Sequence, residues 1–302
     1  MSKKTIGVIG QGFVGGSLTR VFDERGFDVY AFDKAGVYVN EALKISSAGY
    51  QYTLEKMVVC LESKERFTGV YFVCVPTPMR QDGSADLRIV ESVLRELAEI
   101  PGDRIAVVKS TVIPGSTANW NEMFNAQGLT VVFNPEFLTE ANAVNDMRNQ
   151  DRIIVGGPRP ATGTVKDVFR SAFPDVTIIK TGSTEAETVK YFTNCFLATK
   201  VSFANEMNEI CNGLGIDYDK VVEYALYDKR IGTTHLSVPG PDGSLGFGGH
   251  CFPKDLNAIR ALGKNLNVKT DVLDGVWDKN LDVRSSSDRD WEKMKGRAVS
   301  ED

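Results

Sequence analysis

The glycine turn near the N-terminus constrains the fold of this chain more than any other feature. A β-type apolar run leads directly into Gly10-x-Gly12-x-x-Gly15. A helical pattern over residues 14–25 and a strand pattern over residues 28–32 follow, and Asp33 comes next. Strand, glycine turn, helix, strand and acid within about thirty residues form the fingerprint of a dinucleotide-binding unit. The sequence therefore predicts a Rossmann-type α/β domain built on a doubly wound parallel sheet.

The residues of this unit also indicate the cofactor. The first glycine permits a tight turn, and the second lets a pyrophosphate reach the helix N-terminus, where N–H groups and the helix dipole favour anions. Asp33 would bind both ribose hydroxyls and repel a 2′-phosphate, which favours NAD over NADP, although Lys34 weakens this inference. The expected cofactor contacts in this unit are Gly10, Gly12, Phe13, Val14, Gly15 and Asp33.

Strand-like and helix-like segments alternate as far as about residue 180. Continuous apolar strands separated by helices indicate a parallel sheet covered on both faces, and ligands bind beyond the carboxyl ends of such strands. Thr77, Ser110, Thr111 and residues 134–136 fall at these ends, so the three hydroxyls are further candidate cofactor contacts. The strand patterns lie at residues 70–75, 105–108, 130–133, 152–155 and 176–179, with a helix pattern at 86–99.

The pattern becomes helical after Gly182, with no further strand signal. A Gly/Pro-rich loop over residues 232–249 is long enough to indicate function. We expect an NAD-binding Rossmann domain over residues 1–183, an all-helical second domain over 184–284, and a polar, partly disordered tail over 285–302. The helices of the second domain are expected at residues 184–212, 217–227, 255–262 and 268–283.

Composition and charge exclude several classes of protein. The 302 residues carry a formal net charge of −5 and no basic stripe, which argues against a nucleic-acid partner. No apolar run approaches the ~20 residues of a membrane span, and the N-terminal apolar stretch is better explained as a buried strand than as a signal peptide. Five cysteines without close pairing indicate a reducing, cytoplasmic setting. With two histidines and no Cys-x-x-Cys, we expect no metal site.

Cys251 lies in a second glycine-rich segment, which reads Gly246-Phe247-Gly248-Gly249-His250-Cys251-Phe252-Pro253-Lys254-Asp255. Glycines let a backbone come close to a ligand, and a thiol beside a cation is a better nucleophile. Lys254 and a helix beginning at Asp255 would both lower the pKa of Cys251. The segment therefore indicates covalent chemistry through sulfur, whereas the other four cysteines are expected to be small buried hydrophobes.

Three further segments accompany the cysteine. Residues 109–115 form a strand-end turn with two hydroxyls, and residues 134–140 carry Glu136 and Glu140, which share one face if the segment is helical. Lys190 and Asn194 are also four apart, on the long helix, so both can reach one pocket. In order and spacing, the four segments resemble the nucleotide-sugar dehydrogenases, the family of UDP-glucose and GDP-mannose dehydrogenases, from residue 4 to about residue 284.

The resemblance implies a four-electron oxidation of a sugar C6 alcohol to a carboxylate with two NAD⁺, with UDP-glucose to UDP-glucuronate as the expected reaction. It implies that Cys251 attacks the aldehyde and that Lys190 and Asn194 stabilise charge on the C6 oxygen. Water would be held or activated by Asp255 together with Thr111 and Glu140, and Glu136 is implied as an acid/base candidate.

The family resemblance also implies a homodimer, formed through the helical domain, in which Arg230 reaches the substrate of the neighbouring subunit. The other substrate contacts that it implies are Phe137, Leu138, Phe247, Gly248 and Gly249, and the other cofactor contacts are Glu140 and Lys254.

Two features depart from the family pattern. His250 stands where a small residue is usual; it either points away from the site or contacts the thiolate or the substrate. The family usually has a third, α/β domain that covers the substrate nucleotide, and this sequence reaches residue 302 about where that domain would begin. Three explanations stay open: a separate chain supplies the domain, the enzyme is naturally minimal and a partner subunit closes the site, or the chain is a fragment or a relic that binds without turning over.

Two other functions stay open at this stage. A two-electron β-hydroxy-acid dehydrogenase shares a glycine-fingerprint domain, a helical second domain and a lysine four residues before an asparagine. Cys251, Glu136 and Glu140 discriminate against it, because a two-electron oxidation needs no thiol. The third possibility is a non-catalytic subunit that binds NAD or a nucleotide sugar and needs a partner for its missing lid.

Overall fold

A computed structural model describes residues 3–34, 36–39 and 54–301, and groups the chain into two compact units. Unit 1 comprises residues 1–77 and 87–190, and unit 2 comprises residues 78–86 and 191–302. The boundary lies within helix α7 (Ser183–Leu214), after Lys190.

Unit 1 is built on a mostly parallel sheet, which confirms the predicted Rossmann-type α/β class. The described residues form eight strands in the order β3-β2-β1-β4-β5-β6-β7-β8. Two pairs are antiparallel: the edge strand β3 on β2, and β7 on β6 through Phe133 and Gly156. The strands are β1 (Thr5–Ile9), β2 (Asp28–Asp33), β3 (Gly36–Val39), β4 (Phe67–Val73), β5 (Arg104–Val108), β6 (Leu129–Phe133), β7 (Arg152–Gly156) and β8 (Thr177–Thr181).

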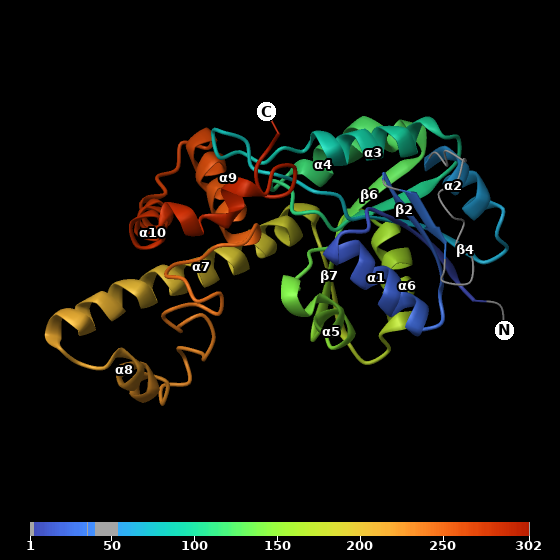
Figure 1. Cartoon of the computed structure of the whole chain (residues 1–302). Helices are drawn as coiled ribbons and strands as arrows, with labels where there is room; N and C mark the ends of the chain where they lie inside the picture. The colour runs from blue at the N-terminus through green and yellow to red at the C-terminus, as the bar shows by residue number, and fades with distance from the viewer. Residues whose placement is uncertain (1–2, 35, 40–53, 302) are drawn as a thin grey trace. The chain divides into compact units, whose positions relative to one another are not determined.

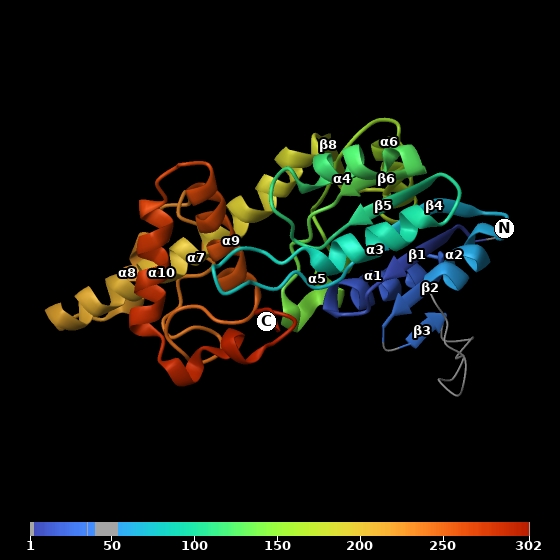
Figure 2. The same cartoon turned by 90° about the horizontal axis from the view of Figure 1, so that it is seen from above.

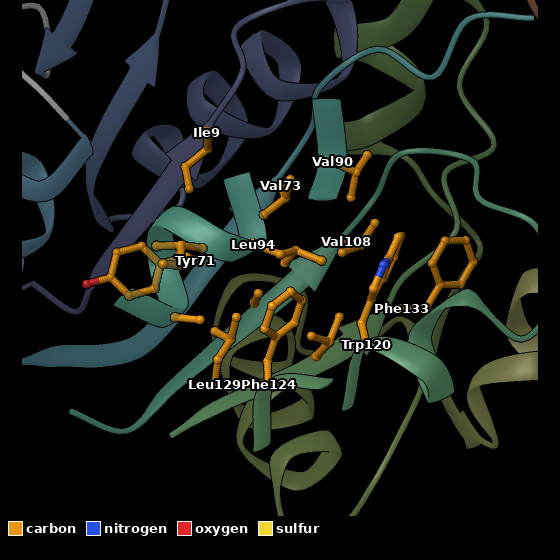
Figure 3. Packing of buried hydrophobic residues seen from close by; sticks show 14 of the residues in the cluster. Ile9, Tyr71, Val73, Val90, Leu94, Val108, Trp120, Phe124, Leu129 and Phe133 are labelled. Atoms are coloured by element: carbon orange, nitrogen blue, oxygen red, sulfur yellow. The ribbon is translucent and has the colours of Figure 1, made fainter. Parts of the chain in front are cut away.

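Helices cover both faces of this sheet, as the continuous apolar strands predict. In Figures 1 and 2, α3 (Arg88–Glu99) and α4 (Ser116–Phe124) lie on one side, with α2 (Leu54–Glu62) over the same core. Figure 3 shows Leu94, Trp120 and Phe124 packed on strand residues in this core. The opposite face is covered by α1 (Phe13–Glu24), α5 (Ala143–Arg148) and α6 (Ala161–Ala172). Burying each large apolar side chain contributes about 1.5–3 kcal/mol.

Unit 2 is helical, as predicted for the second domain. Its helices are the C-terminal part of α7, α8 (Tyr218–Ala225), α9 (Cys251–Asn265) and α10 (Asp271–Val283). A small core joins three of them, with Ala198 of α7, Leu256 of α9 and Val276 of α10 in one cluster. Helix α9 begins four residues before the predicted start at Asp255, because Pro253 falls in its first turn, where a missing N–H breaks no helical bond.

The tail after α10 is packed, so the expectation of a partly disordered tail was wrong. Trp291 is 2% exposed, and its ring lies 5.9 Å from that of Trp277. The Met79 N–H donates to the Ala298 carbonyl at 2.8 Å, and the Ser300 N–H donates to the Met79 carbonyl at 2.7 Å. Although the tail is mostly polar, it contains one large apolar side chain, Trp291. Burial of this side chain offsets part of the conformational entropy lost when the segment is ordered.

Candidate active site

The glycine turn follows β1 and leads into α1, as the fingerprint predicts. Gly10 has φ +88°, and a Cβ there would lie 2.5 Å from the Cys74 carbonyl oxygen, so only glycine fits. A Cβ at Gly15 would lie 1.9 Å from the Gly10 oxygen. At Gly12 a Cβ would meet nothing within 4 Å, which leaves the backbone open to approach at the start of α1, where Phe13 and Val14 follow. The turn thus fits a cofactor pyrophosphate.

Asp33, the predicted ribose contact, and three other predicted cofactor contacts of unit 1 follow or end strands. Asp33 ends β2, and its Oδ2 accepts the Gln11 N–H of the glycine turn at 2.8 Å. Ser110 and Thr111 follow β5 and Thr77 follows β4, and all three side chains are buried. The Ser110 hydroxyl donates to the Val75 carbonyl at 2.6 Å. The parallel sheet therefore brings the ends of β1, β2, β4 and β5 to one edge, as predicted.

Lys190 and Glu136 form a buried ion pair in unit 1. The Lys190 ammonium donates to Glu136 Oε1 at 2.9 Å and to the Glu136 carbonyl at 2.7 Å. Burial alone would raise the pKa of Glu136, but the charge and hydrogen bond of Lys190 and the Leu138 N–H together lower it. Glu136 is therefore a carboxylate held by a cation, and Lys190 is positioned through it.

Glu136 and Glu140 do not share a helical face, because the segment that carries them is not a helix. Residues 134–139 are irregular, and only a short 3-10 turn, Glu140–Asn142, follows. The Glu136 carbonyl accepts the Lys190 ammonium instead of a helical N–H, and the Glu136 carboxylate accepts the Leu138 N–H at 2.7 Å. Glu136 is buried and Glu140 is exposed. Between them, Leu138 is half-buried, and the Phe137 ring lies 4.3 Å from the Arg152 guanidinium and 5.8 Å from the Lys190 ammonium.

Sequence reasoning missed two buried groups of unit 1. Lys109 donates to the Asn134 amide oxygen at 2.7 Å, and the Asn134 amide donates to the Ile154 carbonyl at 2.7 Å. Burial lowers the pKa of Lys109. This chain of bonds ties the ends of β5 and β6 to the middle of β7. Lys109 lies in the predicted strand-end turn, where the hydroxyls of Ser110 and Thr111 are the recognisable cofactor candidates.

Glu187, on α7, is the second missed group and is fully buried. Its carboxylate accepts the Gly115 N–H at 2.6 Å and the Thr117 N–H at 2.8 Å, so it caps the N-terminus of α4. Burial raises the pKa of Glu187, against these hydrogen bonds. The cap fastens the N-terminal part of α7, which carries Lys190, to the turn that carries Thr111.

Cys251 is the first residue of α9 in unit 2, with His250 as the N-cap residue. The cysteine is half-buried, whereas Cys74, Cys195 and Cys211 are buried. Burial raises the pKa of Cys74 to about 12 and that of Cys195 to about 12. An N-terminal helix position, with its N–H groups and dipole, favours a thiolate, so Cys251 is the cysteine best placed to be a nucleophile.

A polar cluster lies about one turn along α9. It contains Lys254 and Asp255 of that helix and Asn194 of α7. The Asn194 amide donates to Asp255 Oδ2 at 2.6 Å, and the Lys254 ammonium is paired with the other oxygen of Asp255. All three side chains are buried. Asp255 thus orients both an amide from α7 and a lysine from its own helix.

Asparagine side chains support the cysteine loop, which we define as residues 246–251. Asn280 Oδ1 accepts the Phe247 N–H at 2.7 Å, and the Asn280 amide donates to the Phe247 carbonyl at 3.1 Å. Asn205 Oδ1 accepts the Gly246 N–H at 3.2 Å. Phe247 is buried against Phe252 and Trp277, while Gly248 and Gly249 continue the loop toward Cys251.

Arg230 lies away from these clusters, in the loop after α8. Its guanidinium contacts Asp228 through Nε at 2.9 Å and 3.0 Å, and the side chain is exposed. Within one chain Arg230 is therefore a surface residue, which is the arrangement required of a group that acts on another molecule.

A Rossmann sheet with this glycine turn and Asp33 defines unit 1 as a dinucleotide-binding domain. The comparison with known proteins makes the class specific: the chain belongs to the UDP-glucose/GDP-mannose dehydrogenase family. Residues 4–173 match the family's NAD binding domain, and residues 184–282 match its central domain. The cofactor of unit 1 is therefore NAD.

Individual relatives support this assignment. The chain is 33% identical to a putative UDP-glucose 6-dehydrogenase, YtcA, of Bacillus subtilis, over 89% of this chain and 65% of that protein. It is 33% identical to the UDP-glucose 6-dehydrogenase AglM of Haloferax volcanii, over 92% of this chain and 71% of that one. A solved UDP-glucose dehydrogenase from Pyrobaculum islandicum is 32% identical with a TM-score of 0.74, over 92% of this chain and 68% of that one. The chain thus spans about two thirds of the length of these proteins.

Among the helices of the described residues, none has an apolar stretch of the length that a membrane span needs. The same residues contain no group of three or more histidine, cysteine, aspartate or glutamate side chains arranged to hold a metal ion.

Proposed function

We propose that this protein oxidises the C6 alcohol of a nucleotide sugar to a carboxylate with NAD⁺, and that the sugar is UDP-glucose. The observation that carries the proposal is Cys251 at the first position of α9, after a glycine loop, in a chain of this family. The described relatives support the substrate, because they are named UDP-glucose 6-dehydrogenases. The reaction takes place in the cytoplasm, where a reducing environment keeps thiols such as Cys251 reduced.

The chemistry needs a covalent intermediate because an aldehyde must become tetrahedral before it can lose a hydride. Bound NAD supplies the hydride acceptor for two successive oxidations. After the alcohol has become an aldehyde, the Cys251 thiolate adds to its carbon and gives a thiohemiacetal. Loss of hydride from this adduct leaves a thioester, which water cleaves to the carboxylate and the thiol. In balance, one alcohol, one water and two NAD⁺ give one carboxylate, two NADH and three protons.

The contacts of the other residues support distinct roles. Lys190 and Asn194 stabilise negative charge on the C6 oxygen, and each is already oriented by a carboxylate, Glu136 and Asp255 respectively. Asp255 and Thr111 hold the hydrolytic water, with Glu140 from the exposed turn. Because Lys190 holds the Glu136 carboxylate in its charged form, Glu136 acts as a base or as a positioning group.

The substrate and cofactor contacts expected from the family complete this proposal. Phe137, Leu138, Phe247, Gly248 and Gly249 contact the sugar nucleotide, and Lys254 contacts NAD. The two-electron β-hydroxy-acid alternative is less well supported, because it gives Cys251 no task.

The exposed face of α7 supports a homodimer. Five large apolar side chains of α7 are exposed: Phe192, Phe196, Phe203, Ile210 and Leu214. With 3.6 residues per turn they lie within about 40° of one another around the helix, so they form one stripe. A second copy with the same stripe buries it, and Arg230 then acts in the partner's site. Sedimentation equilibrium tests this: Phe196→Asp together with Phe203→Asp gives monomers, whereas Asn212→Asp, an exposed polar position of α7, leaves dimers.

The experiment that tests the activity is the number of NADH formed per sugar consumed, with purified protein, excess NAD⁺ and a limiting panel of nucleotide sugars. Two NADH per UDP-glucose is the expected result. One NADH per substrate, with a small hydroxy acid, would replace the proposal with the β-hydroxy-acid alternative. Binding of NAD and sugar without turnover would replace it with a binding subunit that needs a separate chain.

A further inference from the structure

The tail of the chain binds the backbone of the cysteine loop. The Gly249 N–H, two residues before Cys251, donates to both carboxylate oxygens of Asp290, at 3.0 Å and 3.1 Å. The loop is also pressed onto this group, since a Cβ at Gly248 would lie 2.6 Å from Asp290 Oδ1. The same Cβ would lie 2.3 Å from an Arg284 nitrogen. Gly248 therefore allows the loop to rest directly on a carboxylate and a guanidinium.

Arg284 connects the segment before the cysteine loop to the tail of the chain. It is 3% exposed, and its Nη2 lies 2.7 Å from Asp242 Oδ2 and 3.7 Å from Asp290 Oδ1. Its other nitrogens donate to the carbonyls of Leu245, at 3.2 Å, and Asp288, at 2.8 Å. One buried cation thus contacts the residue before the cysteine loop and two residues of the tail. Such a multiply bonded guanidinium fixes the position of its carboxylate partners.

The tail has its own anchors, so Asp290 is not carried by a frayed end. The next residue, Trp291, is buried against Trp277. The centre of the Trp291 ring lies 6.0 Å from the Arg284 guanidinium. Further along, the backbone of residues 298–300 pairs with Met79. The carboxylate is therefore presented to Gly249 by an ordered segment.

We propose that Asp290 is a positioning residue for Cys251: by holding the Gly249 amide, it keeps the thiol at the N-terminus of α9. The inference rests on the proposed function in taking Cys251 as the nucleophile. Gly246 and Gly249 both have positive φ, 67° and 69°, so the loop is intrinsically free to change conformation once its anchor is lost. A displacement of a reacting group by about 1 Å can cost on the order of 100-fold in rate.

Two substitutions at Asp290 separate its charge from its hydrogen bond. Asp290→Ala removes both, whereas Asp290→Asn removes the charge and keeps an acceptor for Gly249. Glu292→Ala is the matched control, an exposed tail carboxylate two residues away. In Asp290→Ala we expect hydrogen exchange of the Gly249 amide to rise about tenfold or more and kcat to fall about tenfold, with the KM for NAD unchanged. In Asp290→Asn we expect Gly249 exchange and kcat to stay close to those of the unchanged protein. Glu292→Ala should change neither the exchange nor kcat.

Labelling of Cys251 with iodoacetamide, followed by peptide mass spectrometry, connects the loop to the thiol without needing turnover. The exposed Cys60 serves as the internal reference. The pH midpoint of Cys251 labelling should be higher in Asp290→Ala than in Asp290→Asn, since both lack the charge and only Ala releases the loop from the helix end. Coincident midpoints in the two variants, or unchanged Gly249 exchange in Asp290→Ala, would overturn the proposal. If the unchanged protein shows no turnover, the proposed function fails while exchange and labelling still decide the role of Asp290.

Discussion

The two units hold their candidate catalytic groups in different ways. In unit 1, Lys190 is held by Glu136, and both are named by the sequence motifs that point to the site. In unit 2, the cysteine loop is held through its backbone: Asn280 lies 33 residues after Phe247, which it binds, and Asp290 lies 41 residues after Gly249. The first arrangement concentrates charge in a fixed pair on a sheet frame, and the second fixes the path of a glycine-rich loop. Motifs therefore reveal catalytic groups more readily than they reveal what supports a loop.

The proposed function assigns the covalent step to the loop of unit 2, and Cys251→Ser tests this with the largest expected effect. We expect acid formation to fall by a thousandfold or more, on the order seen when a nucleophile is removed, because the hydroxyl is far less nucleophilic than a thiolate. Acid formation is measured as NADH per sugar and by product analysis. Cys195→Ser, a change at a buried cysteine, serves as the control for folding. Full four-electron turnover by Cys251→Ser would falsify the covalent mechanism.

Removing one partner of the ion pair of unit 1 should destabilise the protein strongly. Glu136→Gln leaves the buried Lys190 ammonium without its carboxylate, and breaking one partner of a buried pair typically costs about 3–5 kcal/mol. Urea unfolding measures this loss, and Glu122→Gln, on the surface of α4, should cost nothing comparable. If Glu136→Gln unfolds at the same urea concentration as the unchanged protein, the pair does not hold unit 1 together.

The same pair predicts the sign of a pH effect. Because the folded-state pKa of Glu136 is lower than its ordinary value of 4.5, the unfolded chain takes up the proton first. The stabilisation by Glu136 is therefore fully present above about pH 4.5 and is lost as the pH falls further. Urea unfolding between pH 7 and pH 3.5 should show a smaller acid loss in Glu136→Gln than in the unchanged protein.

Whether the sequence predicts a functional or supporting residue depends on how far apart in the chain the interacting groups lie. Asp33, Thr77 and Ser110 could be placed at one sheet edge because parallel strands bring their carboxyl ends together. Four-residue spacing could not establish a helical face for Glu136 and Glu140, because the Glu136 carbonyl is bound by the distant Lys190 ammonium instead of a helical N–H. Asn280, Asp290 and Glu187 could not be found, since each carboxylate or amide binds the backbone of a distant segment, and backbone amides leave no residue-specific signal.

The cofactor turn of unit 1 offers a milder test, through Asp33→Ala. We expect NAD to bind about tenfold more weakly and the preference over NADP to narrow, because a charge-assisted hydrogen bond to the ribose and the repulsion of a 2′-phosphate are both lost. Fluorescence titration with each reduced cofactor measures the change. Asp28→Ala, at the other end of β2, controls for strand damage. Equal affinities before and after the substitution would show that Asp33 serves the glycine turn through Gln11 and not the ribose.

Glu187 gives the smallest expected effect and sharpens the comparison most, because it supports unit 1 in the manner of unit 2, by a side chain bound to distant backbone. Glu187→Ala should lower the free energy of unfolding by about 1 kcal/mol, the usual cost of a lost helix cap, while the exposed Glu185→Ala should not. Burial raises the pKa of Glu187, so in the unchanged protein this carboxyl favours the folded state more as the pH falls, opposite in sign to Glu136. If removal of Glu187 also slows turnover while NAD binding is unchanged, unit 1 too depends on backbone anchoring, and the contrast between the units is one of degree.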